Sequence, residues 1–205
     1  MPADPDPVPV PDPERSGAGL YLHVPFCTSV CPYCDFAVLI AGAERRLAYL
    51  AGVEAEAGQH AGEPWRFDTA YLGGGTPSSL PPEALERLLA ALRSRNVQPD
   101  AVLHLEVNPE DVTRTSARAW RHLGFSFVSL GAQSLDDARL RQLGRRHSAA
   151  ASRVAFQHLR EAGFPTVSMD LIYGSPGDEP DWWGGQRRWV LRLSVSGCYV
   201  RRGCC

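Results

Sequence analysis

Three cysteines lie close together near the beginning of the sequence. Cys27, Cys31 and Cys34 form a C-x3-C-x2-C pattern within the run from Tyr21 to Phe36. Thiolates are the usual ligands of iron–sulfur clusters, and each of the four irons of a cubane [4Fe–4S] cluster takes an outside ligand. Three thiolates therefore hold three irons and leave the fourth open to a substrate or cofactor. The spacing favours such a cluster.

Other uses of these cysteines remain open. A zinc site takes four ligands, commonly in two close pairs; His23 and Asp35 are near, but no second C-x2-C pair follows. Residues 1–10 lack the basic and apolar regions of a secretory signal, so we expect a cytoplasmic protein, in which disulfides are rare. Buried structural cysteines are the third alternative, although the flanking Pro25 and Pro32 do not resemble core sequence.

Composition is that of an ordinary globular chain. The 205 residues are 44% hydrophobic and 21% charged, which is enough for a domain with a core. The net charge of -2 gives no electrostatic basis for binding nucleic acid or an anionic membrane. No apolar run reaches the length of a membrane span, so membrane association is expected only through a partner.

Strand and helix patterns alternate along the chain. This alternation predicts an α/β fold of βα units whose parallel strands can curl into a barrel. The expected strands are 20–24, 68–72, 101–107, 125–130 and 166–173, and the expected helices are 43–58, 82–94, 113–123, 134–143 and 148–162.

Polar and glycine-rich residues fall at the ends of these strands, where barrels of this type collect their chemistry. Two carboxylates within strands, Glu106 and Asp170, are costly unless paired or hydrogen-bonded, and together they favour a site. Glycines 73–75 fit either a plain turn or close approach of a ligand. Gln133 is expected to cap the following helix and Arg145 to lie in a solvated loop, with contact to a ligand as the alternative for each. No Ser-His-Asp or Cys-His arrangement is visible, and no catalytic residue is predicted.

The motifs resemble those of the radical S-adenosylmethionine (SAM) superfamily, whose signature is C-x3-C-x2-C. More closely, the sequence is similar to the family of oxygen-independent coproporphyrinogen III oxidases and HemW heme chaperones. The resemblance implies an incomplete radical SAM partial TIM barrel of about five βα units over residues 19–183. The resembling segments are Tyr21–Cys27, Cys31–Phe36, Tyr71–Pro77, Glu106–Pro109, Leu130–Ser134, Leu143–Arg145 and Met169–Gly174.

The resemblance also implies roles for residues at matching positions. Cys27, Cys31 and Cys34 would bind a [4Fe–4S] cluster, and SAM would bind the open iron through its amino and carboxylate groups. An electron donor would reduce the cluster, leading to cleavage of SAM. The SAM-binding surface, with residues 74–76 along the methionine part, would comprise Tyr21, Tyr33, Gly74, Gly75, Thr76, Glu106, Gln133, Arg145 and Asp170.

One position separates the two branches of this family. The oxidase branch carries a further cysteine two residues after the third cluster ligand, where this sequence has Phe36. The resemblance therefore favours a HemW-type chaperone, which binds heme as cargo and passes it to a heme-accepting respiratory protein. That branch is not expected to oxidise coproporphyrinogen, and the oxidase is the alternative.

The two ends of the sequence differ from its middle. Residues 1–18 are rich in Pro and Asp and are expected to be a disordered leader. Residues 184–205 contain no Asp or Glu, and all 21 basic residues of the chain are arginine, so we predict a frameshift near residues 181–185 in high-G+C DNA. Family members continue through a sixth strand and a C-terminal domain. A truncated, non-functional product with an unpaired edge on the fifth strand is the third hypothesis.

Overall fold

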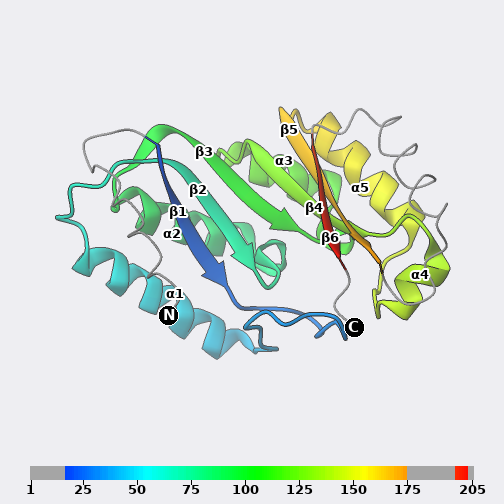
Figure 1. The fold of residues 1–205 in the computed structure, drawn as a ribbon. Helices are drawn as coiled ribbons and strands as arrows, with labels where there is room; N and C mark the ends of the chain where they lie inside the picture. The colour runs from blue at the N-terminus through cyan, green and yellow to red at the C-terminus, as the bar shows by residue number, and fades with distance from the viewer. Residues whose placement is uncertain (1–16, 175–196, 203–205) are drawn as a thin grey trace, which may run out of the picture.

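The protein folds around one parallel sheet whose strands follow each other in chain order (Figure 1). The computed structural model describes residues 17–174 and, through the backbone alone, residues 197–202. Most of the leader and tail predicted for residues 1–18 and 184–205 lies outside these residues. The strands are β1 (Ala18–Val24), β2 (Phe67–Gly74), β3 (Val97–Val107), β4 (Phe127–Gln133), β5 (Thr166–Tyr173) and β6 (Gly197–Arg202).

Helices connect the strands and pack along one face of the sheet (Figure 1). Local signals start two of them: Thr113 forms a capping box with Ser116, and the hydroxyl of Ser148 accepts a hydrogen bond from the backbone N–H of Ala151. The helices are α1 (Ala43–Gln59), α2 (Pro82–Arg93), α3 (Arg114–His122), α4 (Asp137–Gln142) and α5 (Ala149–Glu161), with 3-10 turns at Pro77–Ser79 and Pro109–Asp111.

Alternation along the strands separates the core from the opposite face. Leu72, Leu105, Val128 and Val167 are paired in register across β2 to β5, and none is exposed to solvent. Their neighbours in sequence point the other way, because successive strand residues face opposite sides of a sheet. The apolar face is covered by the helices, where Trp120 of α3 is buried. The other face is left free to form a site.

The predicted α/β class and the order of elements are confirmed, but the edge beyond β5 differs from the expectation. β5 does not end the sheet: β6 pairs with it in parallel from Ser168↔Gly197 to Tyr173↔Arg202. Pairing uses backbone groups that nearly every residue carries, so an unusual side-chain composition does not prevent it. The frameshift remains a prediction about the gene.

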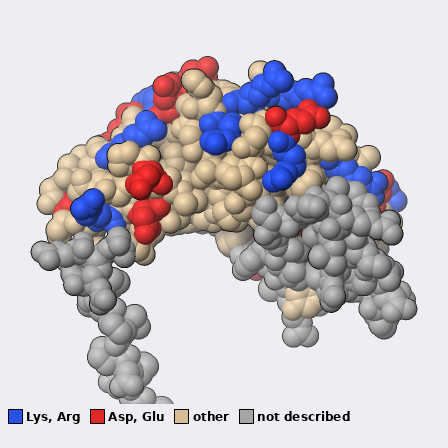
Figure 2. Space-filling view, turned by 90° about the horizontal axis from the view of Figure 1, so that it is seen from above, with Lys and Arg blue, Asp and Glu red and all other residues tan. Residues whose placement is uncertain are grey.

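In the described part of the chain, the surface charge and the helices agree with what the composition predicts. Basic and acidic side chains are mixed on the face seen in Figure 2. None of the described helices combines the length and the apolar character needed to cross a membrane.

Candidate cluster and cofactor site

A cavity of about 1260 Å³ opens at the carboxyl ends of the strands. The loop after β1 forms one wall, and the ends of β2 to β5 form the other. Tyr21, which was expected to bind SAM, is not among the described residues that line it. The other predicted site residues all line the cavity: Cys27, Cys31, Tyr33, Cys34, Gly74, Gly75, Thr76, Glu106, Gln133, Arg145 and Asp170.

Backbone hydrogen bonds fasten the base of the cysteine loop to the sheet. The N–H of Cys27 donates to the carbonyl of Leu39 at 3.1 Å, and the N–H of Leu39 donates to the carbonyl of Pro25 at 2.8 Å. The N–H of Thr76 donates to the carbonyl of Phe26 at 2.7 Å, and the Phe26 ring is buried. The first cysteine is therefore held against the end of β2.

The glycines after β2 are required by the approach of the protein's own chain. A Cβ on Gly75 would lie 2.7–2.8 Å from backbone atoms of Val24, Pro25 and Phe26, closer than real side chains tolerate. Gly74 has φ +107°, and a Cβ there would lie 2.4 Å from the ring of His23. Close packing of the cysteine loop thus explains why this turn lacks side chains.

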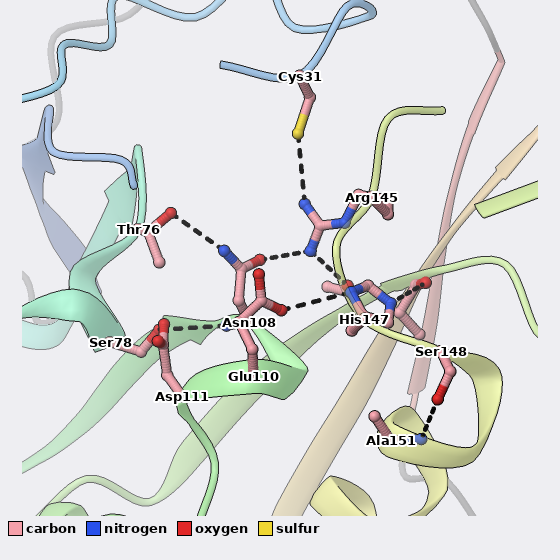
Figure 3. A network of polar contacts seen from close by, with 12 residues as sticks. Cys31, Thr76, Ser78, Asn108, Glu110, Asp111, Arg145, His147, Ser148 and Ala151 are labelled. Carbon is pink, nitrogen blue, oxygen red and sulfur yellow. Dashed lines mark hydrogen bonds and ion pairs between the residues drawn. The ribbon is translucent and has the colours of Figure 1, made fainter. Parts of the chain in front are cut away.

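A chain of polar side chains joins two of the thiols, and Figure 3 shows its part from Thr76 through Asn108 and Arg145 to Cys31. The hydroxyl of Thr76 donates to the sulfur of Cys27 at 3.5 Å, and the amide nitrogen of Asn108 donates to the same hydroxyl oxygen at 3.2 Å. The amide oxygen of Asn108 accepts from Nη2 of Arg145 at 2.7 Å, and Nη1 donates to the sulfur of Cys31 at 3.7 Å. Residues that follow β2, β3 and α4 thereby form one network with the cysteine loop.

Arg145 brings a buried positive charge to this network. Its Nη1 also donates to the hydroxyl of Tyr33 at 3.4 Å, and Nη2 donates to the carbonyl of Gly131 at 3.1 Å. Burial favours the neutral guanidine, but Tyr33, Cys31 and Glu110 outweigh it and raise the pKa of Arg145. The buried Nε has no hydrogen-bond partner in the described part of the chain.

Burial affects the nearby acidic groups in the opposite sense. It raises the pKa of the Cys27 thiol, although the hydrogen bond from Thr76 lowers it. It also raises the pKa of Tyr33 strongly, against the effect of Arg145. Both groups are therefore held in their neutral forms near neutral pH unless a metal displaces the thiol proton.

The Glu106 carboxylate is engaged by the protein itself. The hydroxyl of Tyr71 donates to Oε1, and the backbone N–H of Gly74 donates to Oε2 at 3.0 Å. The carboxylate that was expected to accept hydrogen bonds from a ligand thus also holds the glycine turn in place. Glu106 also lines the cavity.

A row of rings crosses β1 to β4. Tyr71, His104 and Phe127, which sequence reasoning missed as site residues, line the cavity, whereas Tyr21 does not. Tyr21, Tyr71, His104 and Phe127 occupy one register across β1 to β4, with successive ring centroids 5.6, 4.1 and 4.0 Å apart. Burial lowers the pKa of His104 to about 4, so the imidazole is neutral at pH 7. Its Nε2 lies 3.0 Å from the hydroxyl of Ser129. The sequence signal was the period-2 alternation of each strand, which assigns these rings to the face opposite the core.

Two further predicted residues occupy the ends of neighbouring strands. Gln133 closes β4 with φ +62°, which is rare outside glycine, and its neighbourhood contains a register shift against β5. Asp170 lies within β5 and lines the same cavity. Asn108 was predicted only as the end of a strand, and its place in the network is new.

The donor set fits a cluster better than a single zinc ion. Within residues 17–174, no three His, Cys, Asp or Glu side chains are gathered closely enough to hold one metal ion. A cubane offers its irons at separate corners, so its thiolates need not converge on one point. Three thiols around one cavity, with the guanidinium of Arg145 beside the sulfur of Cys31, suit such a cluster.

Fold and site together define a class: parallel βα-barrel proteins with a three-cysteine cluster loop at the carboxyl ends of the strands. The profile of the Radical SAM superfamily matches residues 21–184. The chain therefore belongs to the radical SAM superfamily, and this membership implies a [4Fe–4S] cluster and SAM.

Known proteins similar to the chain come from both branches considered above. It is 38% identical over 169 residues to the heme chaperone HemW of Mycobacterium tuberculosis (strain H37Rv), covering 80% of this chain and 43% of that protein. It is 36% identical to an oxygen-independent coproporphyrinogen III oxidase of Bradyrhizobium diazoefficiens, covering 78% and 37%. The solved coproporphyrinogen III oxidase HemN of Escherichia coli superposes with a TM-score of 0.82 at 27% identity, covering 91% and 44%. The chain spans about two fifths of the length of these relatives.

Proposed function

We propose that the chain is the cluster- and SAM-binding part of a HemW-type heme chaperone. The observation that carries the proposal is the shared cavity: three cysteines of one loop face the glycine turn, Thr76 and Arg145 across it. When bound, the cluster and SAM supply one-electron chemistry. The protein's part is to hold the thiols, to place a guanidinium beside them, and to limit access of water.

Phe36 supports the chaperone over the oxidase. It lines the cavity and is 45% exposed, at the position where the oxidase branch carries a further cysteine. Heme as cargo is supported by the names of the HemW relatives, each called a heme chaperone. A respiratory protein as the recipient is part of the proposal. The oxidase is the second candidate, because one relative and the solved neighbour carry that name.

Anaerobic reconstitution of the 205-residue chain with iron and sulfide tests the cluster. We expect close to four irons per chain, as a cubane requires, and an EPR signal of the reduced cluster that changes when SAM is added. Cys31→Ser should lose the cluster, whereas the control Cys204→Ser, outside the loop, should retain it. Equal iron content in the two variants, or no cluster in the unaltered chain, would contradict the proposal.

Adding the cargo separates the branches. A shift of the heme Soret band on titration of the reconstituted chain is expected for the chaperone, without loss of carboxyl groups from coproporphyrinogen. SAM-dependent decarboxylation of coproporphyrinogen would assign the oxidase instead. A cluster without any heme-induced change would refute heme binding by this part of the chain.

A further inference from the structure

Asn108 occupies the one position in the described part of the site that connects both hydrogen-bonded thiols. Its side chain contacts Thr76 on one side and Arg145 on the other (Figure 3). Thr76 donates to the sulfur of Cys27, and Arg145 donates to the sulfur of Cys31. No prediction from the sequence gave this residue a role in the site. Its geometry allows a specific one.

The direction of each hydrogen bond in the network follows from chemistry alone. A guanidinium can only donate, so the atom of Asn108 that faces Arg145 must be the amide oxygen. The amide nitrogen then faces Thr76 and can only donate, so the Thr76 hydroxyl accepts there. Its single proton remains free for the sulfur of Cys27, 3.5 Å away. The charge of Arg145 thus fixes which way every donor in the chain points.

The backbone holds Asn108 in this position. Its N–H donates to the hydroxyl of Ser78 at 3.1 Å, and that hydroxyl donates to the carboxylate of Asp111 at 2.6 Å. Pro109 follows and restricts the backbone of Asn108 to an extended conformation, observed at φ -91° and ψ 145°. The amide is therefore presented to the network by a rigid strand end.

We propose that Asn108 is a positioning residue that sets the reduction potential of the cluster, by orienting Thr76 as the hydrogen-bond donor to Cys27 and by anchoring Arg145 beside Cys31. Hydrogen bonds to cluster sulfurs stabilise the more negative, reduced state and raise the potential. The inference rests on the proposed cluster function. Beyond that function, the inference assigns to Asn108 the role of connecting the sulfurs of Cys27 and Cys31 through the charged side chain of Arg145.

Asn108→Asp is the sharpest test, because it keeps the shape and replaces the donor nitrogen by an acceptor oxygen. The Thr76 hydroxyl would then donate to the new carboxylate instead of to Cys27. At the midpoint potential of the unaltered protein, we expect the ratio of reduced to oxidised cluster to fall roughly two- to tenfold, the range for one lost hydrogen bond. Asn96→Asp is the control for the same change elsewhere: Asn96 is exposed, does not line the cavity, and donates from its amide to the carbonyl of Glu63.

A second substitution separates the hydroxyl from the added charge. In a Thr76→Val background the hydroxyl is absent, so Asn108→Asp should have a distinctly smaller effect on the potential than in the unaltered chain. Additive effects would overturn the proposal, as would equal potentials for Asn108→Asp and Asn96→Asp. The measurement is an EPR-monitored redox titration of the reconstituted full chain.

Two further variants keep the proposal testable if Asn108→Asp does not fold. Thr76→Val should lower the reduction potential of the cluster, and Thr76→Ser, which keeps the hydroxyl, should not. Identical potentials for these two variants would overturn the proposed role of the Thr76 hydroxyl. If the unaltered chain binds no cluster, the proposed function fails and this inference fails with it. A normal cluster with an insensitive potential would refute the inference alone.

Discussion

Gly75 is the position at which a single methyl group should separate the cysteine loop from the sheet. In Gly75→Ala the new Cβ would lie 2.7 Å from the carbonyl oxygen of Phe26, and 2.8 Å from the carbonyl carbon of Pro25 and the carbonyl oxygen of Val24. All three are backbone atoms, so no side chain can rotate to make room. Ordinary contact begins near 3.4 Å, and each atom would have to move by more than half an ångström.

The energetic cost combines strain with lost hydrogen bonds. Overpacking a tight site costs about 1–3 kcal/mol. The movement would also weaken two short bonds, from Gly75 N–H to Val24 at 2.8 Å and from Thr76 N–H to Phe26 at 2.7 Å, at about 1 kcal/mol each. We therefore expect Gly75→Ala to lower the free energy of unfolding by roughly 3–5 kcal/mol.

Denaturant unfolding of Gly75→Ala beside Gly42→Ala measures this cost. A Cβ added to Gly42 would meet no atom within 4 Å, and Gly42 has no positive φ, so its substitution should change stability by less than about 0.5 kcal/mol. Reconstituted iron content should also fall in Gly75→Ala, because Cys27 directly follows the displaced Phe26. The reasoning is refuted if both variants unfold at the same denaturant concentration and bind equal iron.

The remaining predictions concern pH and individual contacts. Burial lowers the pKa of His104 from 6.5 to about 4. As the pH falls, the unfolded state therefore takes up the proton first, and the free energy of unfolding should fall by at most about 3 kcal/mol between pH 6.5 and 4. Thermal unfolding of His104→Phe should lack this pH-dependent loss, and an identical pH profile for the two proteins would refute the prediction. Tyr71→Phe should lower the free energy of unfolding by about 1–2 kcal/mol, because Glu106 loses a hydrogen-bond donor. The exposed hydroxyl of Tyr21 contacts His23 at 3.2 Å, so Tyr21→Phe should lower it by less in the same denaturant assay. Gly52→Ala, exposed within α1, should raise the melting temperature by stabilising the fold by about 0.5–1 kcal/mol, and a lowered temperature would contradict it.

Hydrophobic alternation was sufficient to predict the order of strands and helices. β5 was predicted at both ends, Thr166–Tyr173, because a run of apolar residues is bounded by Pro165 and Gly174. β3 was placed to begin at residue 101, yet it begins at Val97. Pro99 and Asp100 favour a turn locally, and the adjacent strand supplies pairing that a single sequence does not reveal.

The cysteines could be predicted because their residue type and spacing mark one chemistry, whereas Arg145 was selected only through the family resemblance. The site was not predictable where a role depends on partners far away in sequence. From the sequence, Asn108 is only the end of a strand before Pro109. Its hydrogen-bond partners, Thr76 and Arg145, lie 32 and 37 residues away. From the sequence, His104 is an ordinary strand residue. Its place between the rings of Tyr71 and Phe127 is known only once the strands are paired.

The order in which the ribosome makes this site differs from the order in which its parts are needed. Strands adjacent in the sheet are successive in synthesis, so the sheet can grow at one edge as the chain emerges. The cysteines, however, appear first, and Arg145 follows Cys31 by 114 residues. At 5–20 residues per second this delay lasts roughly 6–23 s. During that time the thiols are exposed to stray metals and oxidants without the side chains that later enclose them.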